Sequence, residues 1–225
     1  MGTIVAIGGG ELRYHETLAI DKEIVKLTGK VKPKALFIPT ASHDAKSYMT
    51  VFKNIYGQQL NCDVSVLQLV DCLIDQEAIE QQILQADLIY VGGGDTAFML
   101  DLWKQLHVDQ YLIKAYKQGT ILSGLSAGAI CWFDYGWSDS QSFITPDDWT
   151  YTLVKGLGLI KGIVCVHYDK EGRDSFDSFI KTQSTIGYGI ENNVAYVLHD
   201  NKAYVIKSDE GKQAYQIKQT SWHIL

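Results

Sequence analysis

The hydrophobic residues in the first half of the chain form short apolar runs that alternate with longer amphipathic segments. Runs of four or five apolar residues are typical of strands that are buried on both faces. They predict strands at Thr3–Ile7, Ala35–Ile38, Val64–Leu69, Leu88–Val91 and Thr120–Ser123. The longer segments have helical spacing and predict helices at Thr17–Thr28, Ser47–Gln59, Gln76–Gln85, Ala97–Leu106 and Gln110–Gln118. This alternation predicts an α/β fold, with a mostly parallel sheet that carries helices on both faces.

The second half of the chain is less helical. Asp134–Thr150 is polar and aromatic and is predicted to be a loop, followed by a strand at Ile163–Val166 and a helix at Asp174–Thr182. From Ile186 onward, short apolar runs are broken by predicted turns at Asn192-Asn193, Asp200-Asn201 and Asp209–Gly211, which predicts a strand-rich, partly antiparallel C-terminal end. No linker separates the halves, so residues 1–225 are expected to form a single α/β domain.

Composition and charge exclude several classes of protein. Of 225 residues, 46% are hydrophobic and 20% charged, which argues against a disordered or fibrous chain. The net charge of −6 argues against a nucleic-acid binder. The chain starts on an apolar run rather than a basic targeting segment, and it lacks a membrane-length apolar stretch, so a cytoplasmic protein is expected. Four cysteines without metal-ligand spacing predict buried free thiols and no metal site: Cys62, Cys72, Cys131 and Cys165.

The strongest chemical signal is the pentapeptide Gly124–Gly128, which reads Gly-Leu-Ser-Ala-Gly. It matches the G-x-S-x-G pattern, and it lies between a predicted strand and the helix-compatible segment Ala129–Phe133. That context indicates a nucleophile elbow, in which a sharp turn projects the Ser126 hydroxyl. The Ala127 amide could then stabilise an oxyanion, with a second amide from the glycines after Val91. The alternative is a tight strand–helix turn with an incidental serine.

A serine nucleophile needs a general base, and histidine is the usual one. His167 directly follows the predicted strand Ile163–Val166. The carboxyl end of a strand is where sheets of this kind place ligands and catalytic groups. We therefore favour His167 over the other five histidines, of which His43 is also near a strand end. A partly buried structural histidine remains the alternative.

The base in turn needs a partner that orients its ring. Glu191 closes the predicted strand Ile186–Ile190, but it could equally be a solvated turn carboxylate. The sequence alone leaves several carboxylates open, and they are Asp134, Asp139, Asp147, Asp148, Asp169, Asp174 and Glu191. A chain order of serine, histidine and then glutamate differs from that of the α/β-hydrolases, where the acid precedes the histidine. This order argues against an ordinary lipase or esterase.

Several segments, taken in order along nearly the whole chain, resemble the dipeptidase E (alpha-aspartyl dipeptidase) family of serine peptidases, to which cyanophycinase is related. These segments are Gly8–Gly10, Ile38–Ser42, Val91–Thr96, Gly124–Ala129, His167 and Gly189–Glu191. The resemblance implies a fold like that of class I glutamine amidotransferases, with serine in place of their cysteine. It also implies a triad of Ser126, His167 and Glu191.

The same resemblance implies an oxyanion hole formed by Gly93 or Gly94 together with Ala127. Asp95 stands where many members of the family have asparagine. The additional carboxylate beside the oxyanion loop is expected to influence which substrate binds.

The arginine count limits how an acidic substrate could be bound. Only Arg13 and Arg173 are arginines among the 20 basic residues. Bidentate binding of a carboxylate favours arginine over lysine. Arg173, six residues after His167, is therefore predicted to bind an acidic side chain of the substrate. The alternative is a solvated charge at the start of a helix.

We therefore predict a serine-type peptidase that cleaves short peptides through an acyl-enzyme on Ser126 and needs no metal or organic cofactor. A small-molecule esterase or amidase and a non-catalytic peptide-binding homologue are the alternatives. A nucleotide-binding loop at Gly8–Gly10 is disfavoured, because G-x-G-x-x-G would need glycine where Arg13 stands. Three aromatic residues of the predicted loop could wall the site, join the core or contact a second copy in a homodimer: Trp137, Phe143 and Trp149.

Overall fold

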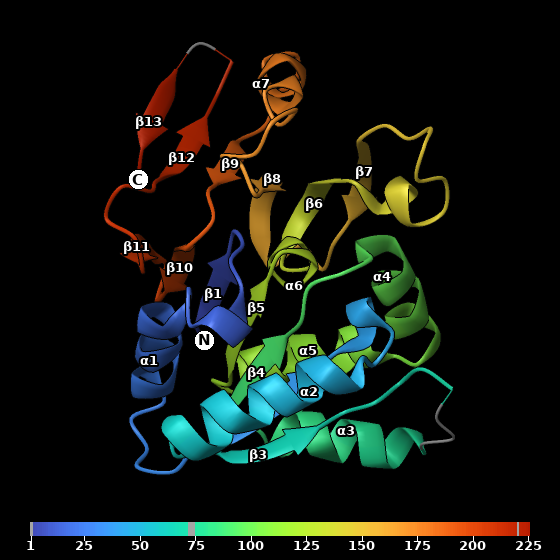
Figure 1. The fold of residues 1–225 in the computed structure, drawn as a ribbon, viewed down its shortest axis with the longest axis vertical. Coiled ribbons are helices and arrows are strands. Elements are labelled where there is room, and N and C mark those ends of the chain that lie inside the picture. The colour runs from blue at the N-terminus through green and yellow to red at the C-terminus, as the bar shows by residue number, and fades with distance from the viewer. Residues whose placement is uncertain (1, 72–74, 220) are drawn as a thin grey trace.

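The computed structural model describes residues 2–71, 75–219 and 221–225. Its central feature is a seven-stranded sheet with the strand order β11-β10-β1-β5-β4-β2-β3 (Figure 1). Strands β1, β5, β4, β2 and β3 are parallel to one another. Strand β10 pairs antiparallel with β1, and β11 pairs antiparallel with β10. Their bounds are β1 (Ile4–Ile7), β2 (Lys34–Ile38), β3 (Asp63–Val66), β4 (Leu88–Val91), β5 (Ile121–Leu125), β10 (Val194–His199) and β11 (Lys202–Lys207). The predicted α/β fold with a mostly parallel sheet is confirmed.

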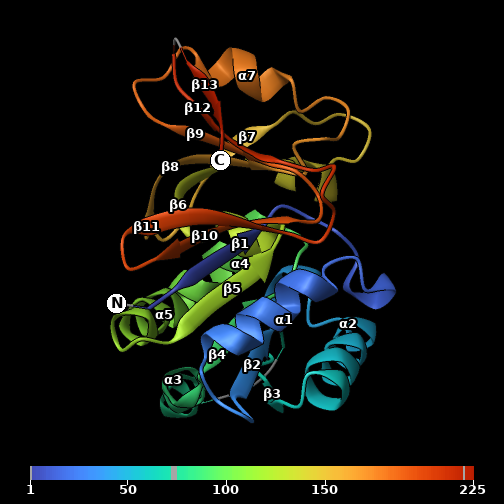
Figure 2. The ribbon, with the colours of Figure 1, turned by 90° about the vertical axis from the view of Figure 1, so that its left-hand side faces the viewer.

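Helices cover both faces of this sheet, as the apolar runs predict (Figure 2). Along β1, Ile4 and Ala6 belong to the core beneath α3, α4 and α5, whereas Val5 and Ile7 belong to the core beneath α1 and α2. The alternation arises because successive side chains of a strand point to opposite faces. The helices are α1 (Leu18–Leu27), α2 (Lys46–Phe52) with a π-helical continuation over Lys53–Gln59, α3 (Gln76–Gln85), α4 (Thr96–Gln105) and α5 (Val108–Lys117).

A second, six-stranded sheet packs over the first and has the order β13-β12-β9-β8-β6-β7 (Figure 2). Its central strands β6, β8 and β9 are parallel, and the others pair antiparallel. This confirms the predicted strand-rich C-terminal end. The bounds are β6 (Phe133–Ser138), β7 (Thr152–Lys155), β8 (Ile160–Val166), β9 (Gly187–Ile190), β12 (Ala214–Ile217) and β13 (Trp222–Ile224), with α7 (Ser175–Ile180) on the outer face.

The prediction for the segment after the elbow was partly wrong. The helix α6 covers only Ala127–Ile130, and β6 begins at Phe133, inside what was predicted to be helix and then loop. Gly136 of β6 packs closely on Ile130, and Trp137 stacks on Phe179 with 4.4 Å between ring centroids. The polar and aromatic composition therefore reflects a strand that lies between two helices.

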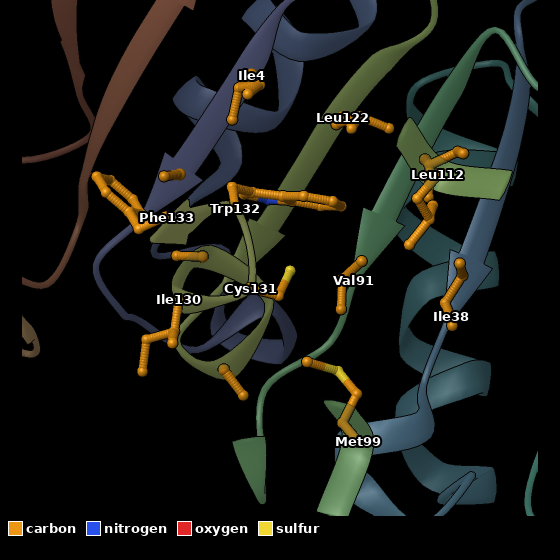
Figure 3. Packing of buried hydrophobic residues seen from close by; sticks show 14 of the residues in the cluster. Ile4, Ile38, Val91, Met99, Leu112, Leu122, Ile130, Cys131, Trp132 and Phe133 are labelled. Carbon is orange, nitrogen blue, oxygen red and sulfur yellow. The ribbon is translucent and has the colours of Figure 1, made fainter. Parts of the chain in front are cut away.

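The two sheets share one continuous apolar core. Ile4 and Leu122 of the first sheet and Phe133 and Val164 of the second belong to the same buried cluster. In Figure 3, Trp132 and Phe133, which follow α6, lie beside β1 and β5. This packing brings the carboxyl ends of strands from both sheets together. A backbone hydrogen bond joins them, in which the amide of His167, directly after β8, donates to the carbonyl of Gly8, directly after β1.

Three of the four cysteines, Cys62, Cys131 and Cys165, are buried free thiols, and Cys72 lies outside the described residues. Across the described ranges, no helix combines the length and the apolar character that crossing a membrane requires. The same ranges contain no cluster of three or more histidine, cysteine, aspartate or glutamate side chains that could hold a metal ion.

A buried carboxyl group in α1 gives a prediction about stability. Asp21 is fully buried and accepts hydrogen bonds from Tyr56 at 2.8 Å and from Thr17 at 2.9 Å. Burial raises the pKa of Asp21 to about 7. Because the folded-state pKa lies above the unfolded one, folding loses stability as pH rises from about 4 to about 7. Asp21→Asn removes this penalty, so the variant should gain stability relative to wild type between pH 5 and pH 8, by on the order of a few kcal/mol.

The measurement is the free energy of unfolding of both proteins by urea at the two pH values. An equal pH dependence in wild type and variant would contradict the assignment of the raised pKa to Asp21.

Candidate active site

The sharp strand–helix turn that the sequence predicts at Ser126 is formed. Ser126 follows β5 directly and has φ 57° and ψ −113°, a strained conformation that turns its side chain out of the chain path. Its amide donates to the carbonyl of Ile7 at the end of β1 (3.0 Å). A Cβ at Gly124 would overlap the backbone of Gly128, and one at Gly128 would overlap the backbone of Val91. The glycines therefore allow the tight turn that the serine needs.

The structure brings His167 to Ser126. His167 follows β8, and its Nε2 lies 2.9 Å from the Ser126 Oγ. The His167 amide donates to the carbonyl of Gly8 (2.9 Å). This bond fixes the end of β8 in the second sheet against the first glycine loop, Gly8–Gly10, which follows β1. The histidine therefore comes from one sheet and the serine from the other.

The residue that orients His167 is Asn192. The Asn192 Oδ1 lies 2.6 Å from the His167 Nδ1. With the amide oxygen as acceptor, the ring carries its proton on Nδ1 and presents an unprotonated Nε2 to Ser126. A Cβ at Gly9 would overlap both the Asn192 oxygen and the His167 ring. The absence of a side chain at Gly9 therefore leaves the space that the His167 ring and the Asn192 amide occupy.

Within the described residues, Glu191 makes no hydrogen bond to His167, so the structure does not bring the three residues of the expected triad together. Its carboxylate points toward β12, where it accepts from the amide of Gln213 at 2.9 Å and from the hydroxyl of Tyr215 at 3.1 Å. Glu191 immediately follows β9, and successive side chains of an extended chain point in opposite directions. The neighbouring Asn192 therefore faces the histidine.

A charged pair holds the backbone of Asn192. Asp169, two residues after His167, accepts from the Asn192 amide at 2.9 Å. Its other oxygen accepts from Lys212 at 2.6 Å, and the Asp169 side chain is only 13% exposed. These bonds lower the pKa of Asp169 and raise that of Lys212, despite the burial of the carboxylate. The pair therefore fixes the chain that presents the asparagine.

The electrostatic surroundings keep His167 neutral. Burial is the largest cause that lowers the pKa of His167 to about 4, and the positive charges of Lys170 and Arg173 act in the same direction. The hydrogen bond to Asn192 and the charge of Asp139 raise it less. At neutral pH the imidazole is therefore unprotonated, which is the form that a general base requires.

The second glycine loop, Gly92–Gly94 after β4, lies against the turn at Ser126. A Cβ at Gly93 would lie 3.3 Å from the Ser126 Cβ. The Gly93 amide lies against the hydroxyl of Tyr48, whose pKa burial raises above its usual range. Within the described residues, the amides of Gly94 and Ala127 donate to no hydrogen-bond acceptor. Two amides near the serine are therefore free to bind an oxygen.

Ser126 and His167 open onto one cavity of about 410 Å³. Binding sites for small ligands are typically of this size or larger. Its lining is partly apolar, from Leu12, Tyr48, Val51 and Leu125, and also includes charged residues. The other lining residues are Gly10, Glu11, Arg13, Ser42, Ala45, Ser47, Gly93, Gly94 and Lys170.

Neither predicted substrate-binding residue lines this cavity. Asp95 is buried and caps α4, where its carboxylate accepts from the amides of Ala97 (3.0 Å) and Phe98 (3.2 Å). Arg173 is also buried: it donates to Asp139 at 2.9 Å, and its guanidinium lies 4.6 Å from the ring centroid of Tyr151. An aspartate directly after a glycine-rich turn is a good helix cap, and a buried arginine needs an internal partner.

The three aromatic residues that could wall the site also lie elsewhere. Trp137 stacks on Phe179 of α7, and Trp149 packs edge-on against Tyr151. Phe143 is 54% exposed. None of them lines the cavity that contains Ser126.

Sequence reasoning missed Asn192 and the role of Gly9. Asn192 and Asn193 were expected to form a turn, which is the usual place for asparagine pairs. One signal was available, because Asn192 follows a strand end at the carboxyl edge of the sheet. Only carboxylates were considered as partners of the base, although an asparagine oxygen can also accept from the ring.

Comparisons with known proteins find a peptidase family and a peptidase relative. The family model "Peptidase family S51" matches residues 4–206. The "Uncharacterized peptidase YgaJ" of Bacillus subtilis (strain 168) is 32% identical over 229 residues, which cover 100% of this chain and 95% of that protein.

Two solved structures share the fold. A peptidase from an acI-B1 Actinobacterium superposes with a TM-score of 0.76 at 22% identity, over 100% of this chain and 94% of that one. A protein from Listeria monocytogenes EGD-e that is provisionally assigned as a peptidase E gives a TM-score of 0.69 at 19% identity, over 92% and 98% of the two chains. The resemblance drawn from the sequence motifs is confirmed.

Proposed function

The chain belongs to peptidase family S51, and we propose that it hydrolyses short peptides through an acyl-enzyme on Ser126. The observation that carries the proposal is the 2.9 Å contact between the Ser126 Oγ and the Nε2 of a neutral, oriented His167. A nucleophile in hydrogen-bond contact with a base, which is itself oriented by a third group, is the arrangement that activates serine.

In the first half of the reaction, His167 takes the proton of Ser126 while Oγ attacks the peptide carbonyl. The carbonyl oxygen becomes an oxyanion, which the amides of Gly94 and Ala127 stabilise; Gly93 packs beside the serine. The C–N bond then breaks, and His167 passes its proton to the departing amine. The products are an ester on Ser126 and a free amino group.

In the second half, water attacks the ester. His167 accepts a proton from the water as its oxygen bonds to the acyl carbon, and returns that proton to Ser126 as the ester bond breaks. Asn192 takes the place of the carboxylate in this scheme. It fixes the tautomer of His167, but it is neutral and adds no charge to stabilise the imidazolium.

The size of the cavity supports a short substrate. A volume of about 410 Å³ suits a few residues rather than a folded protein segment. With Arg173 bound to Asp139, the arginine that lines the cavity is Arg13. The Arg13 Nε lies 3.5 Å from the Glu11 Oε2, and the Arg13 side chain is 54% exposed. Binding of an acidic side chain by Arg173 is therefore not part of the proposal.

Covalent labelling tests the proposal. A fluorophosphonate probe reacts with an activated serine and should attach one label per folded chain, located at Ser126 by peptide mass mapping. Denatured protein should not react, because activation depends on His167. A folded chain that remains unlabelled would instead indicate a non-catalytic peptide-binding protein.

A further inference from the structure

Lys170 is a cation in the cavity, and its charge is not neutralised by any carboxylate of the described residues. It lines the same cavity as Ser126 and His167. No carboxylate lies within 4.0 Å of its ammonium group among residues 2–71, 75–219 and 221–225. The neighbouring cations are all paired: Arg13 with Glu11, Arg173 with Asp139 and Lys212 with Asp169.

The position of Lys170 relative to His167 indicates which part of a substrate it meets. The two residues share one turn, in which the Lys170 amide donates to the His167 carbonyl at 2.9 Å. Because His167 must protonate the departing amine, the residue that leaves lies on its side of Ser126. A charge on this turn therefore faces the leaving residue rather than the acyl residue.

We propose that Lys170 binds a carboxylate of the leaving residue, most simply the free C-terminal carboxylate of a dipeptide. This inference rests on the proposed function of the site. It makes Lys170 a specificity-determining residue on the side of the leaving residue, where it would favour a peptide with a free C-terminal carboxylate over the corresponding amide. An ammonium group that lines the cavity, is exposed and has no carboxylate partner can take such a group without breaking an existing ion pair.

Binding a carboxylate there would also act on the base. The charges that act on the pKa of His167 are Lys170 and Arg173 on its own loop, which lower it, and Asp139 on the segment before Ser140–Phe143, which raises it; Asp169, two residues from His167, is paired with Lys212. The positive charge of Lys170 lowers the pKa of His167, and a bound carboxylate would offset that charge. The substrate would then supply some of the negative charge that the neutral Asn192 lacks.

The test compares three peptides that share the acyl residue turned over fastest by the wild-type protein. The first ends in leucine with a free carboxylate, the second is its C-terminal amide, and the third is an amide with glutamate in place of leucine. For wild type, kcat/KM should be roughly tenfold higher for the free acid than for the leucine amide, as expected for a charged hydrogen bond. Lys170→Met should bring this ratio close to one, and Lys170→Arg should largely retain it.

The control is Lys181→Met, which removes an exposed lysine that does not line this cavity and should leave the ratio unchanged. Faster cleavage of the glutamate amide than of the free acid would show that a side-chain carboxylate is bound instead of the C-terminal one, and would overturn the C-terminal assignment. Equal rates for acid and amide in wild type, or a ratio unaffected by Lys170→Met, would overturn the role of Lys170 and leave the peptidase proposal standing. If none of a wider set of peptides is cleaved, the proposed function falls and this inference falls with it.

Discussion

Replacing Ser126 with alanine is expected to lower kcat for peptide hydrolysis by roughly 10⁴-fold or more, the scale at which serine peptidases lose activity without their nucleophile. Among the described residues, the Ser126 hydroxyl makes one side-chain hydrogen bond, to His167. Alanine keeps the Cβ that the turn already accommodates, so the fold should be retained. The measurement is the turnover of a panel of dipeptides with aspartyl or non-acidic residues on the acyl side, with the products quantified by chromatography.

Ser47→Ala provides the matched control, because Ser47 lines the same cavity and should leave kcat unchanged when its hydroxyl is removed. Equal peptide turnover by Ser126→Ala and wild type would contradict the acyl-enzyme mechanism. If the wild-type protein cleaves small esters but no peptide in the panel, the activity is that of an esterase or amidase of small acyl compounds.

The first sheet could be predicted closely because its fold depends on local patterns. Strands such as Leu88–Val91 are continuous apolar runs, and the helices between them have an apolar face, so each element is recognisable from its own residues. The elbow could be predicted for the same reason, since Gly124 and Gly128 are needed within the turn itself. His167 could be predicted as a site residue because it directly follows a strand.

The features that were missed depend on contacts between segments far apart in the sequence. Whether Glu191 or Asn192 faces His167 depends on where β9 ends relative to β8, and one residue of difference reverses the side chains. Arg173 could not be assigned, because its partner Asp139 lies 34 residues away in a segment whose strand was not recognised. Single-sequence patterns carry no information about such pairings.

Changing Asn192 to aspartate should alter the pH dependence of the reaction. A carboxylate in place of the amide, 2.6 Å from Nδ1, would favour the protonated imidazole and raise the pKa of His167 above about 4. An adjacent opposite charge typically shifts a pKa by roughly one to three units. Because the base works only when neutral, the acid limb of kcat/KM should move to higher pH by that amount.

At pH values above the new pKa, Asn192→Asp should be at least as fast as wild type, because the carboxylate stabilises the imidazolium that forms in the transition state. Asn192→Ala should instead lower kcat by roughly 10²–10⁴-fold, since the ring loses the acceptor that fixes its tautomer. Both effects are read from pH profiles of kcat and kcat/KM on the same dipeptide.

Glu191→Gln separates this assignment from the triad implied by the family resemblance. Glu191 bonds to Gln213 and Tyr215 rather than to His167, so its amide variant should leave the acid limb in place. A fall in kcat for Glu191→Gln comparable with that for Asn192→Ala, together with a shifted acid limb, would mean that the glutamate is the partner of the base after all. An unshifted limb in Glu191→Gln and an upward shift in Asn192→Asp would establish that a neutral residue holds the histidine in this enzyme. The weak basicity of His167 would then follow from the absence of a charge at position 192 as well as from burial.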